Sequence, residues 1–253
     1  MTSFKDRLVA GHPLVGTFMK TPSPMLCEVF GRSALDVICL DAEHSPFDRG
    51  DLDRCVFSLK ASGKPALVRV PSCQPEHILN ALDLGADGIL APHIITKADA
   101  EALVDAATFG QGRGYSGSTR AAGYMAKTMA QHLEGSKGSA ALIAQIEDAA
   151  ALDNVGDILS VDGIDCVFIG RADLTVSLGY DTPAAAPVVE AVEAICKAAK
   201  AAGCPSGMFT SDLSELGHWK SLGASLFLLG SDHSFLLAGA KQLTDTAEAQ
   251  LEP

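Results

Sequence analysis

Eight short apolar segments that alternate with helix-length segments predict a (β/α)8 barrel, the TIM barrel fold. Each apolar segment has the length of a strand and is apolar on both faces, as strands are in a parallel sheet that helices cover. Eight such units within 253 residues match the usual size of this barrel. A doubly wound open sheet is the alternative, but the G-x-G-x-x-G motif of its dinucleotide-binding form does not follow the first strand. We therefore predict one domain, residues 1–253.

The expected strands are distributed over the whole chain. They cover residues 14–19, 36–41, 66–70, 88–92, 141–147, 166–170, 206–210 and 225–230. The helix-length segments between them include 22–34, 76–86, 97–110, 187–203 and 212–224. Gly85, Gly203 and Gly223 stand just beyond three of these helices, where glycine commonly ends a helix. The glycine-rich segment 110–138 is longer than a plain crossover, so we expect it to form a lid or a subunit contact.

The composition restricts the possible partners. The chain has 19 Lys and Arg against 31 Asp and Glu, and nucleic acid and anionic membranes repel the resulting net charge of −12. No apolar stretch approaches the roughly 20 residues that cross a bilayer, and the first residues lack the pattern of a secretory signal. The seven cysteines form no C-x-x-C pair and are expected to be buried thiols. These features predict a soluble, cytoplasmic protein that binds small molecules or further copies of itself.

Polar residues gather at the ends of the predicted strands. In a barrel of this type the carboxyl ends of all strands surround one mouth, and active sites lie there. The polar residues at these positions are Lys20, Asp41, Glu43, His44, Arg69, His93, Gln145, Glu147, Arg171, Asp173, Ser211 and Asp212. We therefore expect the functional site among them.

Glu147 and Asp173 are candidate ligands of a divalent cation. Gln145 and Glu147 are two residues apart on a strand, so both side chains point to the same side. Asp173 follows the next strand and is expected close enough to Glu147 to share an ion. Two carboxylates with several waters suit Mg²⁺ or Mn²⁺. The alternative is that both acids are solvated or that Asp173 caps the helix that follows.

His44, Asp41 and Arg69 are candidate catalytic residues. Asp41 and Glu43 are placed to orient the His44 ring and to favour its proton, as a general base requires. A guanidinium inside an apolar strand, as at Arg69, needs an anion or a paired carboxylate. The alternatives are a structural histidine and an ion pair of Arg69 with Glu43 or Glu147.

Seven motifs, in order along residues 16–179, resemble the HpcH/HpaI family of metal-dependent class II pyruvate aldolases. They are "GTFMKTPSP", "DVICLDAEHSPFD", "RVP", "LDLGADGILAPHI", "GRGYSGSTRA", "QIED" and "VDGIDCVFIGRADLTVSLG". The chain is most similar to the hydroxy-oxo-heptanedioate and 2-keto-3-deoxy sugar-acid aldolases of this family. The resemblance implies a barrel of the phosphoenolpyruvate/pyruvate type. It also implies a homohexamer, a trimer of dimers, in which neighbours exchange a terminal helix.

The resemblance further implies a role for each matched residue. Glu147 and Asp173 would hold Mg²⁺, Mn²⁺ or Co²⁺, His44 with Asp41 would form the base, and Arg69 would contact the keto or enolate oxygen. Substrate binding would involve Arg69, Gln145, the backbone of Gly170, Arg171, Ala172 and Asp173, and Asp83 from a neighbouring subunit. The implied reaction is reversible cleavage of a 4-hydroxy-2-oxo acid to pyruvate and an aldehyde.

Three alternatives to this reaction remain. Lys20 would form a Schiff base if the enzyme worked as the lysine-dependent aldolases do. A related lyase would cleave a citryl- or malyl-CoA, although an acidic chain offers little attraction to the phosphates of CoA. A non-catalytic barrel would only bind a keto acid. Arg171 departs from the family pattern, in which many members have proline, and it would serve as a cation at the rim or as a solvated side chain.

Overall fold

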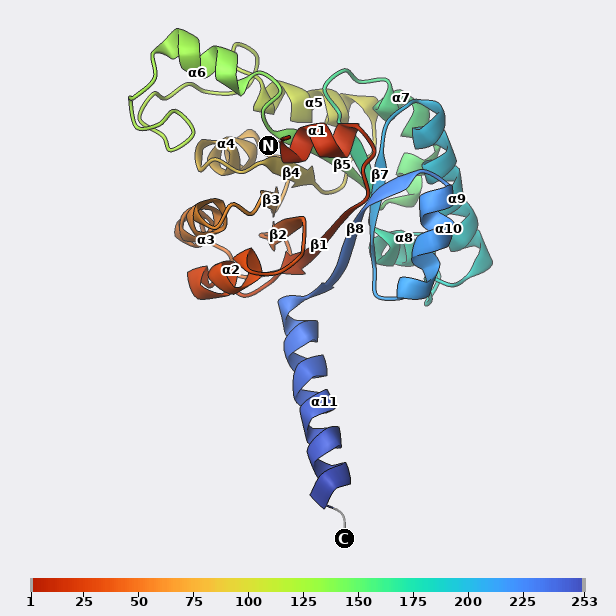
Figure 1. The fold of residues 1–253 in the computed structure, drawn as a ribbon. Coiled ribbons are helices and arrows are strands. Elements are labelled where there is room, and N and C mark those ends of the chain that lie inside the picture. Colours follow the sequence, from red (N-terminus) through yellow and green to blue (C-terminus); the bar gives the residue numbers. More distant parts are fainter. Residues whose placement is uncertain (1, 252–253) are drawn as a thin grey trace.

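The computed structural model describes residues 2–251 and contains a closed barrel of eight parallel strands in the order β1 to β8 (Figure 1). The strands are β1 Leu14–Met19, β2 Val37–Asp41, β3 Ala66–Arg69, β4 Gly88–Ala91, β5 Ala141–Ile146, β6 Cys166–Ile169, β7 Ser206–Thr210 and β8 Ala224–Ser231. The predicted fold is confirmed. Every predicted strand is present, and the bounds differ by at most one residue at either end.

Helices follow the strands and cover the outside of the barrel (Figure 1). They are α1 Phe4–Val9, α2 Pro24–Gly31, α3 Arg49–Ala61, α4 Pro75–Asp83, α5 Lys97–Ala107, α6 Met129–Ser136, α7 Val155–Leu159, α8 Arg171–Ser177, α9 Ala186–Ala201, α10 Leu216–Ser221 and α11 Asp232–Leu251. Two 3-10 helices, η1 Ala149–Asn154 and η2 Leu213–Glu215, complete the set. The expected helix ends at Gly85, Gly203 and Gly223 are confirmed, because all three glycines have positive φ.

The apolar side chains form two layers. An inner cluster fills the barrel and contains side chains from most strands, including Phe18 and Phe168, with Phe4 and Leu8 of α1 closing the amino end. An outer cluster fills the space between the strands and the helices. Both faces of each strand are buried, and this is why the strands are continuous apolar segments in the sequence.

Three aspartates at the amino end of the barrel connect neighbouring strands. Asp36, Asp87 and Asp165 stand just before β2, β4 and β6, and each carboxylate accepts the backbone N–H of a residue near the start of the preceding strand, at 2.9, 3.0 and 2.9 Å. Each also pairs with a cationic side chain, at 2.6 to 2.9 Å. The amino end is therefore tied together by structural ion pairs, which leaves the carboxyl end for chemistry.

The last helix, α11, extends away from the barrel as an isolated rod (Figure 1). Leu236, Leu237 and Leu243 on this helix are 62%, 74% and 72% exposed. An isolated helix with several exposed leucines lacks the packing that normally stabilises a helix in water. Within residues 2–251, no helix is long and apolar enough to cross a membrane.

We predict that Gly16→Ala lowers the free energy of unfolding by about 1–3 kcal/mol. A Cβ at Gly16 in β1 would lie 2.6 Å from the Val37 carbonyl oxygen in the neighbouring strand, and backbone in a closed barrel has little room to move. The control is Gly217→Ala in α10, where a Cβ meets nothing within 4 Å. Urea denaturation measures both variants, and equal stabilities for the two would contradict this explanation of the barrel packing.

Candidate functional site

The carboxyl ends of β2 and β3 hold a buried ion pair between Asp41 and Arg69. These two residues are register partners in adjacent strands. Arg69 Nε donates to Asp41 Oδ1 at 2.9 Å, and Arg69 Nη2 lies 2.8 Å from Asp41 Oδ2. The guanidinium also lies 4.6 Å from the centre of the Phe18 ring, which supports it from inside the barrel. Such a two-point contact fixes the orientation of the guanidinium plane.

A second cation reaches the same carboxylate. Lys20, just beyond β1, places its Nζ 2.9 Å from Asp41 Oδ2. Burial alone would raise the pKa of Asp41, but the hydrogen bonds and charges of Arg69 and Lys20 lower it to about 2. Asp41 is thus a permanent anion that holds two cations in place.

Glu43 lies next to this pair but is less well compensated. Its side chain is only 9% exposed, and its Oε2 lies 3.3 Å from Arg69 Nη1. Burial raises the pKa of Glu43, an effect that the positive charges of Arg69 and His93 offset only in part. Its Oε2 atom is buried without a hydrogen-bond partner. A buried carboxylate oxygen of this kind is an available ligand for a cation.

Glu147 follows β5 and is almost fully buried in the mouth. Gln145 Nε2 donates to Glu147 Oε2, so the two side chains do point to the same side. The backbone N–H of His93 donates to Glu147 Oε1 at 2.9 Å. Burial raises the pKa of Glu147, although these two hydrogen bonds act in the opposite direction. The Oε1 atom of Gln145 is also buried without a partner.

His93, just beyond β4, completes a cluster of potential ligands. One ligand atom from each of Glu43, His93 and Glu147 lies within 4.8 Å of the others. The cluster fits a divalent cation, because two carboxylates and an imidazole each offer a ligand atom to the same small space. His93 was recognised in the sequence as a strand-end residue but was given no role there. A histidine directly after β4, next to a glutamate directly after the neighbouring strand β5, is the pattern that could have identified it in the sequence.

Asp173 lies near this cluster without belonging to it. It is the third residue of α8 and is exposed, and its negative charge contributes to the raised pKa of Glu43. Gly170, at the start of α8, packs directly on Glu147, since a Cβ there would lie 2.6 Å from Glu147 Oε2. The first turn of α8, Arg171 to Asp173, therefore adjoins the buried carboxylates.

Two expectations about side-chain contacts are wrong. Asp41 does not orient the His44 ring: its Oδ1 accepts the His44 backbone N–H at 3.2 Å, while the ring lies 3.7 Å from Glu43 Oε2. Arg69 and Lys20 occupy the remaining contacts of that carboxylate. Arg171 is neither a rim cation nor solvated.

The Arg171 side chain is buried beneath α8. Its Nη1 pairs with Glu215 Oε2 at 2.5 Å, and the guanidinium lies 5.1 Å from the centre of the Trp219 ring. It therefore joins α8 to the segment that follows β7. Asp83, at the end of α4, lies at the amino end of the barrel and pairs with Arg113 at 3.0 Å, far from the mouth of its own chain.

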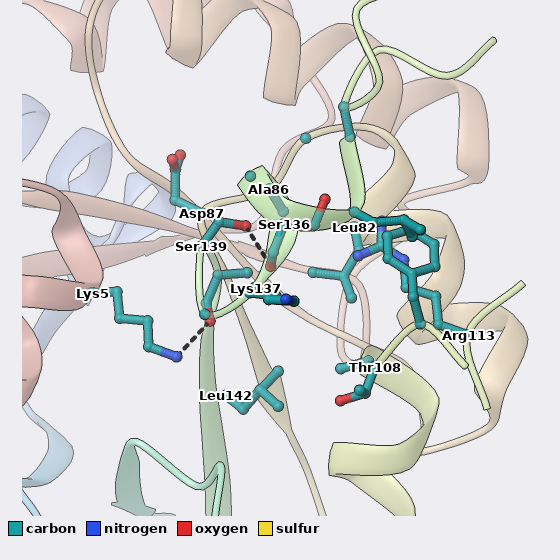
Figure 2. Close-up of a pocket in the computed structure, with 18 of the residues that line it drawn as sticks. Lys5, Leu82, Ala86, Asp87, Thr108, Arg113, Ser136, Lys137, Ser139 and Leu142 are labelled. Carbon is teal, nitrogen blue, oxygen red and sulfur yellow. Dashed lines mark hydrogen bonds between the residues drawn. The ribbon is translucent and has the colours of Figure 1, made fainter. Parts of the chain in front are cut away.

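A large basic cavity lies at the amino end of the barrel, on the side opposite the mouth (Figure 2). Its volume is about 800 Å³, and its cationic lining residues are Lys5, Lys60, Arg113, Arg120, Lys127 and Lys137. Most of these cations are already paired, as Lys5 is with Asp165 and Lys137 with Glu134. The Nε atoms of Arg113 and Arg120 are nevertheless buried without a hydrogen-bond partner, and Asp87 is the one acidic residue among the described lining residues.

Comparison with known proteins decides between the classes of enzyme. Residues 14–238 match the HpcH/HpaI aldolase/citrate lyase family. The chain belongs to this family. It is 33% identical to a 5-keto-4-deoxy-D-glucarate aldolase of Shigella boydii over 246 residues, which cover 96% of this chain and 95% of that protein. The resemblance noted in the sequence is thus confirmed, and the protein is a carbon–carbon lyase of the HpcH/HpaI aldolase type.

Solved structures of the family share the whole fold. An HpcH/HpaI aldolase/citrate lyase family protein from Burkholderia cenocepacia superposes with a TM-score of 0.91 at 30% identity, covering 98% of this chain and 100% of that one. An HpcH/HpaI aldolase from Desulfitobacterium hafniense gives a TM-score of 0.91 at 26% identity, with 100% and 98% coverage. The shared fold therefore extends over at least 98% of this chain.

We predict that Asp41→Asn destabilises the protein by about 3–5 kcal/mol at pH 7, because it leaves Arg69 and Lys20 without their buried anion. The pKa of Asp41 is lower in the folded than in the unfolded chain, so its stabilising effect is present above about pH 4 and is lost as the pH falls toward 2. The difference between wild type and variant should shrink by about 2 kcal/mol over that range.

Urea denaturation between pH 7 and pH 2 tests this prediction. The control is Asp181→Asn, which changes an exposed aspartate and should alter stability by less than about 0.5 kcal/mol. A pH-independent difference between wild type and Asp41→Asn would show that the charge of Asp41 is not what holds the pair.

Proposed function

We propose that the protein catalyses the reversible cleavage of a 4-hydroxy-2-oxo acid to pyruvate and an aldehyde, with a divalent cation held in the mouth by Glu147 and Asp173. The observation that carries the proposal is the group of buried, incompletely compensated carboxylates at the mouth of a barrel of the HpcH/HpaI family. Mg²⁺, Mn²⁺ or Co²⁺ bound there would supply the positive charge that stabilises the enolate left by carbon–carbon cleavage.

The residues of the chain account for the remaining steps. His44, half exposed at the mouth, removes the 4-hydroxyl proton, and the electron pair of the C3–C4 bond then forms the enolate while the aldehyde leaves. Arg69 stabilises the oxygen that becomes negative, and Asp41 holds its guanidinium ready for that contact. The N–H groups of Arg171, Ala172 and Asp173 in the first turn of α8 have no partners within the helix and bind the donor carboxylate. The expected contribution of the Gly170 N–H is wrong, because that group donates to the Ile146 carbonyl at 3.0 Å.

The named relatives suggest a first substrate to test. 5-Keto-4-deoxy-D-glucarate contains a keto group beside one carboxylate and a hydroxyl on the carbon beyond the deoxy position. Cleavage between the deoxy and hydroxyl-bearing carbons gives pyruvate and a three-carbon aldehyde acid. We propose a sugar-acid substrate of this class, in which the aldehyde fragment carries a second carboxylate.

We also propose that the protein works as a homo-oligomer, a hexamer built as a trimer of dimers, in which α11 packs on a neighbouring copy. The exposed leucines of α11 support this arrangement. Segment 110–138 carries further exposed apolar residues, Tyr124 and Met125 among them, and is suited to a subunit contact. Asp83 lies far from the mouth of its own barrel, but in this assembly it would reach the mouth of a neighbouring subunit.

We predict that Glu147→Gln lowers the rate of pyruvate formation from 5-keto-4-deoxy-D-glucarate by about 10²-fold or more, since the buried anion is lost. EDTA should have the same effect on wild type, and added Mn²⁺ should reverse it. Glu190→Gln, which changes an exposed glutamate of α9, is the control and should retain full activity. A coupled assay of pyruvate and the exchange of its methyl protons in deuterated water give the readouts.

Further assays distinguish the alternative reactions. Borohydride in the presence of pyruvate should trap no adduct, and a trapped adduct that Lys20→Ala abolishes would establish Schiff-base chemistry instead. Absence of both cleavage and proton exchange with every divalent metal would favour a barrel that only binds a keto acid. Cleavage of a CoA thioester alone would favour the citryl or malyl type.

We predict that a chain ending at residue 231 forms a smaller assembly than the full chain, because the exposed apolar face of α11 is removed. Sedimentation velocity measures the mass of each species. Unchanged assembly after removal of α11 would contradict its proposed role between subunits.

A further inference from the structure

We infer that His93 is a third ligand of the divalent cation, through its Nε2 atom, and that Glu43 completes the same site. This inference rests on the proposed cation site and adds a nitrogen ligand and a fourth residue to the pair Glu147 and Asp173. It follows from the contacts of the His93 ring, from the spacing of the cluster and from the backbone at the end of β4.

The contacts of the His93 ring leave one nitrogen free to bind an ion. His93 Nδ1 lies 3.0 Å from Asp148 Oδ2, within hydrogen-bond distance, and 3.5 Å from Glu147 Oε1. A carboxylate in this position keeps the proton on Nδ1, so the lone pair of Nε2 points the other way. That atom lies 3.6 Å from Glu43 Oε1. Carboxylate, histidine and cation stand in this order in many metal sites, where the carboxylate fixes the ring.

The spacing within the cluster suits a single ion. Octahedral ions with bonds of about 2.1 Å hold adjacent ligand atoms about 3 Å apart and opposite ones about 4 Å apart. The three ligand atoms of Glu43, His93 and Glu147 all lie within 4.8 Å of one another. The nine-tenths buried side chain of Glu43 also has an Oε2 atom without a hydrogen-bond partner. The Glu43 oxygen that faces the ring is Oε1, at 3.6 Å from His93 Nε2, whereas Oε2 faces Arg69 Nη1 at 3.3 Å. An ion between the cluster residues would bind the Oε1 atom and separate the two carboxylates.

The backbone holds His93 in place beside Glu147. His93 has a φ of 54°, a left-handed conformation that is uncommon for residues other than glycine. Its N–H donates to Glu147 Oε1 at 2.9 Å, and the next N–H, of Ile94, donates to the Gln145 carbonyl at 3.1 Å. The turn after β4 is thereby fastened to the end of β5, and the ring is directed over the buried carboxylates.

A nitrogen ligand changes which ions the site prefers. Oxygen ligands alone suit Mg²⁺ as well as Mn²⁺, whereas imidazole favours Co²⁺, Ni²⁺ and Zn²⁺. The site should therefore bind Co²⁺ and Mn²⁺ more tightly than Mg²⁺, and His93 should account for much of the difference. Replacing the imidazole with an amide retains the polar contact to Asp148 but removes the nitrogen ligand.

The test is electron spin echo spectroscopy of the purified protein loaded with Mn²⁺, together with calorimetric titration of Mn²⁺, Co²⁺ and Mg²⁺. Wild type should show the ¹⁴N modulation of a directly bound imidazole, and His93→Asn should lose it. The dissociation constant for Co²⁺ should rise about tenfold or more in the variant, while that for Mg²⁺ should change by less than about threefold. Asp148→Asn should weaken Co²⁺ binding to a smaller extent.

The control is His44→Asn, which removes the other imidazole near Glu43 and should leave the ¹⁴N modulation intact. Modulation that persists in His93→Asn, or that disappears only in His44→Asn, overturns the inference. Metal binding that Glu147→Gln abolishes, without any ¹⁴N modulation in wild type, refutes the His93 ligand but leaves the proposed aldolase intact. If both Glu147→Gln and His93→Asn still bind Mn²⁺ as wild type does, the cation site itself is refuted.

Discussion

The carboxylate of Asp41 organises the mouth of the barrel. It is fully buried, it contacts Arg69 at two points and Lys20 at a third, and it also accepts the backbone N–H of His44. One side chain therefore joins the ends of β1, β2 and β3. A buried charge is stable only when such partners surround it, so loss of this carboxylate would leave two cations unpaired in the same place.

This arrangement also explains why the mouth retains negative charge. Arg69 and Lys20 are largely taken by Asp41, and Glu43 and Glu147 are left with raised pKa values and incomplete partners. At the amino end of the barrel, in contrast, Asp165 and Asp87 are paired with Lys5 and Lys60, two cations of the basic cavity. The amino end thus contributes to stability, whereas the carboxyl end holds the incompletely compensated groups, as is usual in (β/α)8 enzymes.

The sequence predicted the placement of the site better than its contacts. Gln145 and Glu147 share a side because strand geometry repeats every two residues, and this is local information. The Asp41 carboxylate could not be assigned in that way, because its partners come from two other strands and replace the expected contact with the His44 ring. Arg171 was equally misplaced, since Glu215 and Trp219, which bury it, are more than forty residues away in the chain.

The sequence by itself determined the fold class, the bounds of the strands and the family, since buried parallel strands and ordered motifs are visible as local patterns. Only the tertiary structure decided which charges meet. It paired Arg69 and Lys20 with Asp41, removed Arg171 from the rim, and brought His93 to Glu43 and Glu147. Ion pairs and ligand clusters depend on distances of a few ångströms between separate strand ends, and closure of the barrel sets those distances.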